Sequence, residues 1–137
     1  MKELTIAAKV ENIEAVTEFV GEELETMDCP MKAKMQINIA IDELFSNIAH
    51  YAYKPGEGDA VVRVEAEDDP RSVVITFIDE GKPYDPLTAA EPDTSLSAEE
   101  RYIGGLGIYM VKKSMDDISY RYENGKNILS IRKKIVS

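Results

Sequence analysis

A carboxylate and an amide one helical turn apart form the first stretch of this sequence that can do chemistry. Glu43 and Asn47 lie in AIDELFSNIAH, which has helical spacing, and residues four apart on a helix share a face. An amide oxygen is a hard ligand for Mg²⁺, and a glutamate can orient a hydroxyl or accept its proton. Taken alone, the pair is better interpreted as a solvated helix face, because short motifs often match by chance.

A second stretch, FIDEGKPYDP, places a carboxylate at the end of an expected strand. Asp79 can accept a hydrogen bond from an amino group, Gly81 lets a flat ligand lie close to the backbone, and Pro83 follows. A hairpin turn is the alternative interpretation, but the prolines that come next make a poor second strand. The stretch therefore favours a strand end that binds a ligand.

A third stretch, GGLGIYMV, puts three glycines at the start of an expected helix. Without side chains, Gly104, Gly105 and Gly107 let their N–H groups approach phosphate oxygens, and the helix N-terminus adds its dipole. A flexible hinge is the alternative interpretation. A Rossmann fingerprint is excluded, because Met110 stands where its third glycine belongs and no preceding strand is evident. A Walker P-loop is absent as well.

The elements that must position these stretches follow from hydrophobic spacing and turn residues. Asn12 is the expected N-cap of the first helix, Pro30 belongs to the first turn of the second, and Asn124-Gly125 is the expected turn of a hairpin. We expect strands at 3–10, 60–68, 72–79, 117–123 and 127–136, and helices at 13–27, at 31–53 and after the glycines. This order predicts one α+β domain over residues 1–137, a two-layer sandwich in which helices cover one face of a mixed β-sheet.

The bulk composition narrows the class of protein. The chain has 137 residues, a formal net charge of −10 and one cysteine, Cys29. Nucleic acid is not an expected partner, because no basic stripe is visible. No apolar run approaches the ~20 residues that span a bilayer, and no signal peptide is visible. A cytoplasmic protein without membrane contact and with a structural cysteine is therefore expected.

In this order, the three stretches resemble one known kind of site. A helical Glu-x-x-x-Asn, a strand-ending Asp-x-Gly-x-Pro, a long lid and a Gly-Gly-x-Gly helix start are similar to the Bergerat (GHKL) ATP site shared by DNA gyrase, MutL and the sensor histidine kinases. The resemblance covers nearly the whole chain. The small size and the stretches DEGKPYDP and GGLGIYMVKKSMDDISY most resemble the anti-sigma-factor serine/threonine kinases of bacterial partner-switching systems.

The resemblance implies a role for each matching residue. Glu43 corresponds to the general base and Asn47 to the magnesium ligand, while Asp79 would hold the adenine amino group with Gly81 and Pro83 beside the base. Residues 84–103 would form the ATP lid, and Arg101 is a candidate for the γ-phosphate, with a plain surface charge as an equal alternative. The triphosphate would be bordered by Gly104, Gly105, Leu106 and Gly107.

One departure from the family pattern concerns the phosphate end. Many relatives carry a Lys-His pair where this chain has His50 and Tyr51. His50 falls on the Glu43 side of the helix and can face the phosphates, although a polar residue at a helix end is the preferred interpretation. The change bears on how firmly the site holds the terminal phosphate. Tyr51, Tyr53 and Tyr84 are expected to pack rather than to contact a nucleotide.

The resemblance also implies an activity and its partners. The chain is expected to be an ATP-dependent serine/threonine protein kinase and anti-sigma factor that uses ATP and Mg²⁺. Its partners would be a sigma factor, which it sequesters, and an anti-anti-sigma (STAS-type) protein, which it phosphorylates, and the chain is expected to form a homodimer. Two alternatives remain: a nucleotide-gated binding module of the same fold without significant kinase activity, and a detached histidine-kinase catalytic domain.

Overall fold

Five strands and three helices make up the described part of the chain. The computed structural model describes residues 1–53, 56–68, 70–88 and 106–135. The strands are β1 (Lys2–Ala7), β2 (Asp59–Glu67), β3 (Ser72–Asp79), β4 (Asp117–Glu123) and β5 (Lys126–Lys134). The helices are α1 (Ile13–Thr26), α2 (Met31–Asn47) and α4 (Leu106–Ser114), with short helical turns η1 (Val10–Asn12), η2 (Ile48–Ala52) and η3 (Pro86–Thr88).

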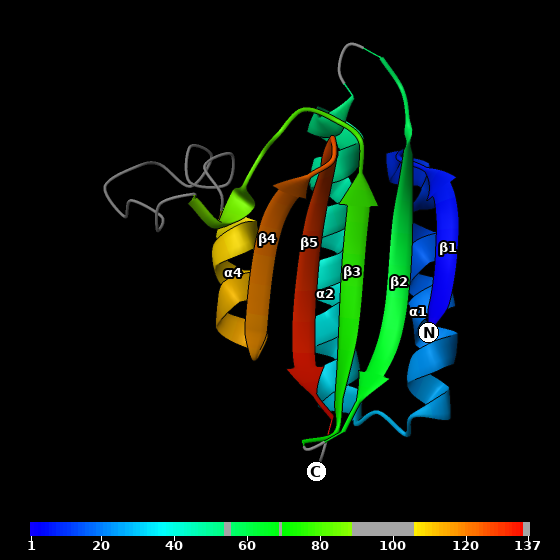
Figure 1. Cartoon of the computed structure of the whole chain (residues 1–137). Helices are drawn as coiled ribbons and strands as arrows, with labels where there is room; N and C mark the ends of the chain where they lie inside the picture. Colours follow the sequence, from blue (N-terminus) through cyan, green and yellow to red (C-terminus); the bar gives the residue numbers. More distant parts are fainter. Residues whose placement is uncertain (54–55, 69, 89–105, 136–137) are drawn as a thin grey trace.

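The strands form one sheet in the order β1-β2-β3-β5-β4, and the helices lie on one face of it (Figure 1). This confirms the expected α+β class with helices on one face. Neighbouring strands all pair antiparallel, so the mixed sheet that we expected has no parallel neighbours. The reason is the place of β5: β3 and β4 run in the same direction, but β5 lies between them and is antiparallel to both.

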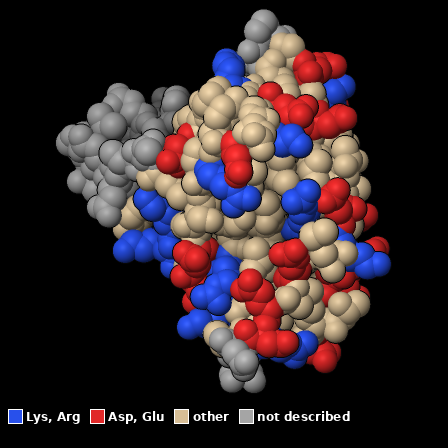
Figure 2. Space-filling view, viewed as in Figure 1, with Lys and Arg blue, Asp and Glu red and all other residues tan. Residues whose placement is uncertain are grey.

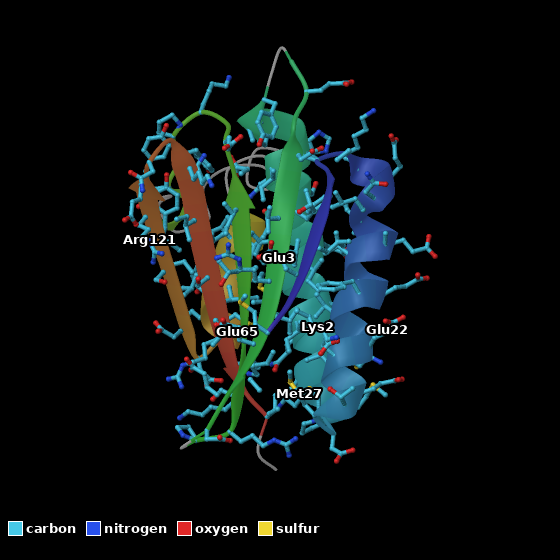
Figure 3. The ribbon with its side chains drawn as sticks, turned by 45° about the vertical axis from the view of Figure 1, so that its right-hand side comes forward. Lys2, Glu3, Glu22, Met27, Glu65 and Arg121 are labelled. Carbon is cyan, nitrogen blue, oxygen red and sulfur yellow. The ribbon has the colours of Figure 1, made fainter. Side chains whose placement is uncertain are left out.

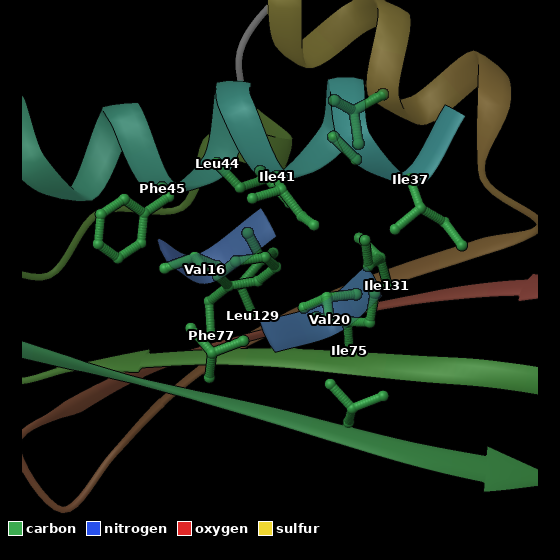
Figure 4. Packing of buried hydrophobic residues seen from close by; sticks show 14 of the residues in the cluster. Val16, Val20, Ile37, Ile41, Leu44, Phe45, Ile75, Phe77, Leu129 and Ile131 are labelled. Atoms are coloured by element: carbon green, nitrogen blue, oxygen red, sulfur yellow. The ribbon is translucent and has the colours of Figure 1, made fainter. Parts of the chain in front are cut away.

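Alternating strand residues and a helical stripe build the core between the two layers (Figure 4). In β2, Val62 and Val64 are buried while their neighbours along the strand are partly exposed, which is the period of a sheet with one covered face. On α2, Ile37, Ile41 and Leu44 recur at helical spacing and are at most 2% exposed, as the sequence predicts. The core therefore fixes the rotation of α2 and with it the direction of the side chains beside the stripe.

The predicted hairpin between β4 and β5 is confirmed, but the predicted helix cap is not. Asn124 and Gly125 have φ angles of 53° and 77°, the left-handed pair that a tight hairpin turn needs. Asn12 makes no side-chain cap bond and has helical dihedral angles itself, because the turn η1 continues directly into α1. Its side chain instead donates a hydrogen bond to the Ala7 carbonyl at 2.9 Å and so ties the start of α1 to the end of β1.

The surface carries charges of both signs. On the open face of the sheet, Lys, Arg, Asp and Glu side chains are interspersed (Figure 2), and Arg63 of β2 pairs with Glu3 of β1 at 2.6 Å. On the helical layer, Glu22 of α1 points away from the sheet (Figure 3). Among the described residues, no helix combines the length and the apolar character that crossing a membrane requires.

Candidate functional site

A cavity of about 1170 Å³ lies where α2 ends, β3 ends and α4 begins. In Figure 1 this is the upper end of the molecule. The volume suits a ligand of drug-like size or larger. Five of the residues predicted to act in catalysis or to bind the nucleotide or Mg²⁺ contribute to its lining, and they come from all three stretches: Glu43, Asn47, Asp79, Pro83 and Gly107.

The remaining predicted residues divide into two groups. Arg101, Gly104 and Gly105 lie outside the described residues, as does most of the 84–103 segment that we expected to form a lid. Leu106 is described as the first residue of α4, and Gly81 is described but does not line the cavity.

Glu43 and Asn47 lie side by side on the cavity wall, as their spacing predicts. The Asn47 Nδ2 donates to Glu43 Oε1 at 3.5 Å, a long bond that leaves the amide oxygen for other partners. Burial raises the pKa of the Glu43 carboxyl, and the bond from Asn47 lowers it by less. A carboxylate with a raised pKa is a stronger base, which suits a group that must take a proton from a hydroxyl.

Gly107 is a glycine because the Glu43 carboxylate occupies the space next to it. A Cβ placed on Gly107 would overlap the carboxyl carbon and both carboxyl oxygens of Glu43. In the structure the missing side chain makes room for this carboxylate, and the expected approach of phosphate oxygens to Gly107 stays a prediction. Because Gly107 is in the first turn of α4, the helix N-terminus also favours the negative charge placed there.

Asp79 is the last residue of β3 and is 6% exposed. Its Oδ1 accepts hydrogen bonds from the Gly81 backbone N–H and from Asn127 Nδ2, both at 2.9 Å. Burial raises the pKa of this carboxyl, and those two bonds oppose the rise. Within the described part of the chain both bonds use Oδ1, so Oδ2 is the oxygen that remains for a ligand in the cavity.

Gly81 serves the packing of the site rather than its lining. A Cβ on Gly81 would overlap the backbone and side chain of Ala52, the last residue of η2. The next residue, Lys82, donates its backbone N–H to the Ala52 carbonyl at 2.9 Å. The glycine therefore lets the turn after β3 lie directly against the end of η2, and its contact with a base remains a prediction.

The long helix expected over 31–53 is continuous up to Ala52, and its last five residues, Ile48–Ala52, form a π-helix, η2. Such wide turns occur often at functional sites. His50 and Tyr51 belong to this turn, are exposed and line the cavity. The two residues that stand in place of the Lys-His pair of many relatives therefore line the same cavity as Glu43.

Only one of the three tyrosines packs as expected. Tyr53 is partly buried, donates its hydroxyl to the Asp59 carbonyl at 2.6 Å and accepts from the Glu80 N–H at 2.7 Å. Tyr51 and Tyr84 are 59% and 54% exposed and line the cavity, so the packing expectation is wrong for both.

Cys29 is a structural residue, as expected. It is half-buried against the core, and burial raises the pKa of its thiol, which disfavours the reactive thiolate. Over the described ranges, no three or more His, Cys, Asp and Glu side chains gather as a metal centre would need.

The sequence analysis missed two polar residues that line the cavity, Asn127 and Tyr120. Asn127 of β5 is 6% exposed and binds Asp79, and its carbonyl oxygen accepts the Tyr120 hydroxyl. A signal for Asn127 was present: it is in phase with the buried Leu129 and Ile131, so a polar amide stands at an inward position of an alternating strand. A buried amide needs partners, and Asp79 is directly opposite in the strand register.

Curated proteins with similar sequences are named as protein kinases. The chain is 27% identical over 100 residues to serine/threonine-protein kinase BtrW of Bordetella bronchiseptica, covering 73% of this chain and 70% of that protein. It is 29% identical over 97 residues to serine-protein kinase RsbW of Listeria monocytogenes, covering 68% and 61%. Against serine-protein kinase RsbW of Bacillus cereus it is 25% identical over 131 residues, covering 93% and 81%.

Solved structures share the fold at lower identity. A structure of the RsbU and RsbW domains of a Mycobacterium tuberculosis protein aligns with a TM-score of 0.69 and 16% identity, covering 98% of this chain and 33% of that one. The SiaB–SiaC complex of Pseudomonas aeruginosa aligns with a TM-score of 0.60 and 17% identity, covering 95% and 88%. At these identities the likeness shows the fold alone.

The family itself is shown by a match along almost the whole chain. The family model described as "Histidine kinase-like ATPase domain" matches residues 6–133. The matched range contains every residue that lines the cavity. This chain is therefore a member of the histidine kinase-like ATPase domain family.

Proposed function

We propose that this protein is an ATP-dependent serine/threonine protein kinase of a bacterial partner-switching system. In this proposal it phosphorylates an anti-anti-sigma (STAS-type) protein, sequesters a sigma factor, and acts in the cytoplasm as a homodimer. Membership of the family supports the binding of ATP, and the printed names of BtrW and RsbW support serine or threonine as the acceptor. The matched region spans 61% of the Listeria protein, so partners remain part of the proposal.

One observation carries the proposal: a single cavity is lined by Glu43 and Asn47 at one wall and by Asp79 at the end of β3. Asp79 offers a buried acceptor oxygen that suits the amino group of adenine. Glu43 offers a half-buried base whose pKa is raised. A nucleotide that placed its adenine ring at Asp79 would extend its phosphates towards Glu43 and the first turn of α4, where the helix dipole favours anions.

The transfer step then needs positioning and charge neutralisation more than covalent help from the protein. Glu43 accepts the proton of the serine or threonine hydroxyl as its oxygen bonds to the γ-phosphorus. The bond between that phosphorus and the oxygen bridging to the β-phosphate breaks, and ADP leaves. The contact of Glu43 with Gly107 fixes the position of the Glu43 carboxylate relative to the start of α4.

The donor atoms beside Glu43 fit Mg²⁺. Asn47 has an amide oxygen left after its bond to Glu43, and a hard, uncharged oxygen suits this ion, which usually takes few protein ligands together with phosphate oxygens. Asn47 would hold the ion, whose charge would offset that of the triphosphate.

Labelled ATP tests the proposal directly. The protein is incubated with γ-labelled ATP, Mg²⁺ and a purified STAS-type protein, and the phosphoprotein is then exposed to acid. Acid-stable label on the partner supports the serine/threonine kinase. Acid-labile label indicates a histidine acceptor and contradicts it. Nucleotide binding without label on any partner supports the nucleotide-gated binding module instead.

A further inference from the structure

Asn127 is a buried polar residue that contacts Asp79 from the neighbouring strand. It is the second residue of β5, is 6% exposed, and pairs with Asp79 in the register between β3 and β5. It also lines the cavity. A buried amide in a strand costs free energy unless its polar atoms are bonded, so its contacts decide what it does.

Every hydrogen-bonding position of the Asn127 amide is used. Nδ2 donates to Asp79 Oδ1 at 2.9 Å and to the Lys82 carbonyl at 2.8 Å. Oδ1 accepts the Tyr84 backbone N–H at 3.1 Å and the Tyr120 hydroxyl. The orientation is therefore fixed: turning the amide over would set two donors against each other at Tyr84 and two acceptors at Lys82.

This arrangement orients Asp79 and opposes the effect of burial on its pKa. The Asn127 amide and the Gly81 N–H both donate to Oδ1, which holds that oxygen in place and favours the ionised carboxylate. Oδ2 is then the carboxylate oxygen that remains to accept a bond from a ligand in the cavity. The same amide fastens the turn after β3 through Lys82 and Tyr84, so the base-binding oxygen and the segment leading away from β3 are fixed together.

We propose that Asn127 is the positioning residue for base recognition, which holds Asp79 as a pure acceptor and so selects a nucleobase that carries an amino group. This inference rests on the proposed nucleotide site. It assigns to one amide the preference for adenine over hypoxanthine, which carries a carbonyl oxygen in place of the amino group. A residue that only filled space in the core would have no such effect.

Asn127→Asp gives a pH-dependent version of the same contact. When protonated, the new carboxyl can donate to Asp79 Oδ1 as the amide does; when ionised, it repels Asp79. Burial and a like charge both raise a carboxyl pKa, so the donor is present at low pH and is lost as pH rises through that pKa. Asn124→Asp is the matched control, because Asn124 is exposed in the hairpin turn of the same two strands and Asp tolerates its left-handed φ.

Other titratable groups surround this pair and are present in both variants. The phenols of Tyr53 and Tyr120 have a pKa raised by burial and stay neutral at and below neutral pH. The charged or ionisable side chains near the pair are Asp59, Glu80, Lys82 and Asp85, with His50 on the cavity wall. These side chains are the same in both variants, so the difference between the two variants isolates residue 127.

Calorimetry with ADP and with IDP tests the inference without any transfer step. At each pH from about 5.5 to about 8, the wild type and Asn124→Asp should bind ADP with equal affinity. Asn127→Asp should approach that affinity at the acid end and lose roughly tenfold or more at the alkaline end. Equal affinities of the two Asp variants at every pH would overturn the inference.

A second variant covers the case in which Asn127→Asp does not fold, as judged by circular dichroism. Asn127→Ala removes the amide without adding charge and should reduce the preference for ADP over IDP by about tenfold. An unchanged preference would overturn the inference. If the wild type binds neither ADP nor ATP, the proposed nucleotide site itself is wrong. If the wild type binds ADP and the variants bind it in the same way, only the inference about Asn127 is wrong.

Discussion

Two effects act in opposite directions on the pKa of the Glu43 carboxyl. Burial raises its pKa, while Asn47 and the N-terminus of α4 stabilise its charged form. Because burial is the larger effect, the carboxylate is a stronger base than an exposed glutamate. At the residue scale, the chemistry of the site therefore depends on how deeply this one side chain is buried.

Glu43→Gln should abolish transfer and spare nucleotide binding. Glutamine keeps the shape but cannot accept the proton, so transfer to the partner should fall about 100-fold or more, while ADP affinity changes by less than about threefold. In the wild type the rate should fall as pH drops through the raised pKa of Glu43, and the variant should lose this acid limb. Glu22→Gln on the outer face of α1 is the control (Figure 3); a similar loss in that variant would contradict the assignment.

Asp79→Asn should reverse the preferred base. The Gly81 N–H and the Asn127 amide can still donate to the remaining oxygen, which turns the new amino group towards the cavity. The site then offers a donor where it offered an acceptor, so IDP should bind better than ADP. Because burial raises the native pKa of Asp79, its charge costs stability above that pKa, and the variant should be more stable than the wild type there. Calorimetry measures the preference between ADP and IDP, and thermal unfolding measures the change in stability. An unchanged preference for ADP would contradict the role of Asp79.

At the scale of elements, glycines set how closely α2, η2 and α4 approach one another. Gly107 lets the first turn of α4 lie against Glu43, and Gly81 lets the turn after β3 lie against Ala52. Beside Glu43 and after β3, close contacts thus exist that a side chain on Gly107 or Gly81 would prevent. The position of the helices, and not only the identity of the polar residues, defines the site.

Gly107→Ala should damage both transfer and folding. The added methyl group must displace either α4 or the Glu43 carboxylate, so stability should fall by about 1–3 kcal/mol and transfer by tenfold or more. Gly21→Ala is the matched control, because a Cβ there meets no atom within 4 Å and alanine favours a helix. Denaturant unfolding and the labelled-ATP assay give the two readouts. Full activity of Gly107→Ala would show that the contact with Glu43 has no role in transfer.

The sequence predicts those parts of the structure that depend on local pattern. The stripe of α2, the Asn124-Gly125 hairpin and the shared face of Glu43 and Asn47 follow from spacing along one element, and all are found. The role of Asn127 depends on the register of two strands far apart in the chain. The reason for Gly107 depends on where two helices touch. The periodicity of β5 marks Asn127 as an inward polar residue, but its partner Asp79 follows only from the strand register, and the contact at Gly107 leaves no periodic signal at all.

At the scale of the whole molecule, the balance of charge bears on association. The chain has 26 acidic and 16 basic residues, a net charge of −10, so two copies repel each other as they approach. The proposed homodimer must overcome this repulsion by burying apolar surface. Exposed apolar side chains are present on the helical layer, where Met31, Met35 and Ile39 of α2 are more than half exposed.

The proposed dimer should therefore become more stable as salt is added. At low ionic strength the fields of the two copies extend ~30 Å or more, whereas near 0.15 M salt they are screened within about 8 Å, so repulsion weakens while apolar contacts persist. Light scattering at several protein and salt concentrations should show the mass rising towards that of two chains as salt increases. A dimer that dissociates on adding salt would mean that ion pairs hold it together. A single-chain mass under all these conditions, with and without ADP, would remove the homodimer from the proposal and leave a site that must act within one chain.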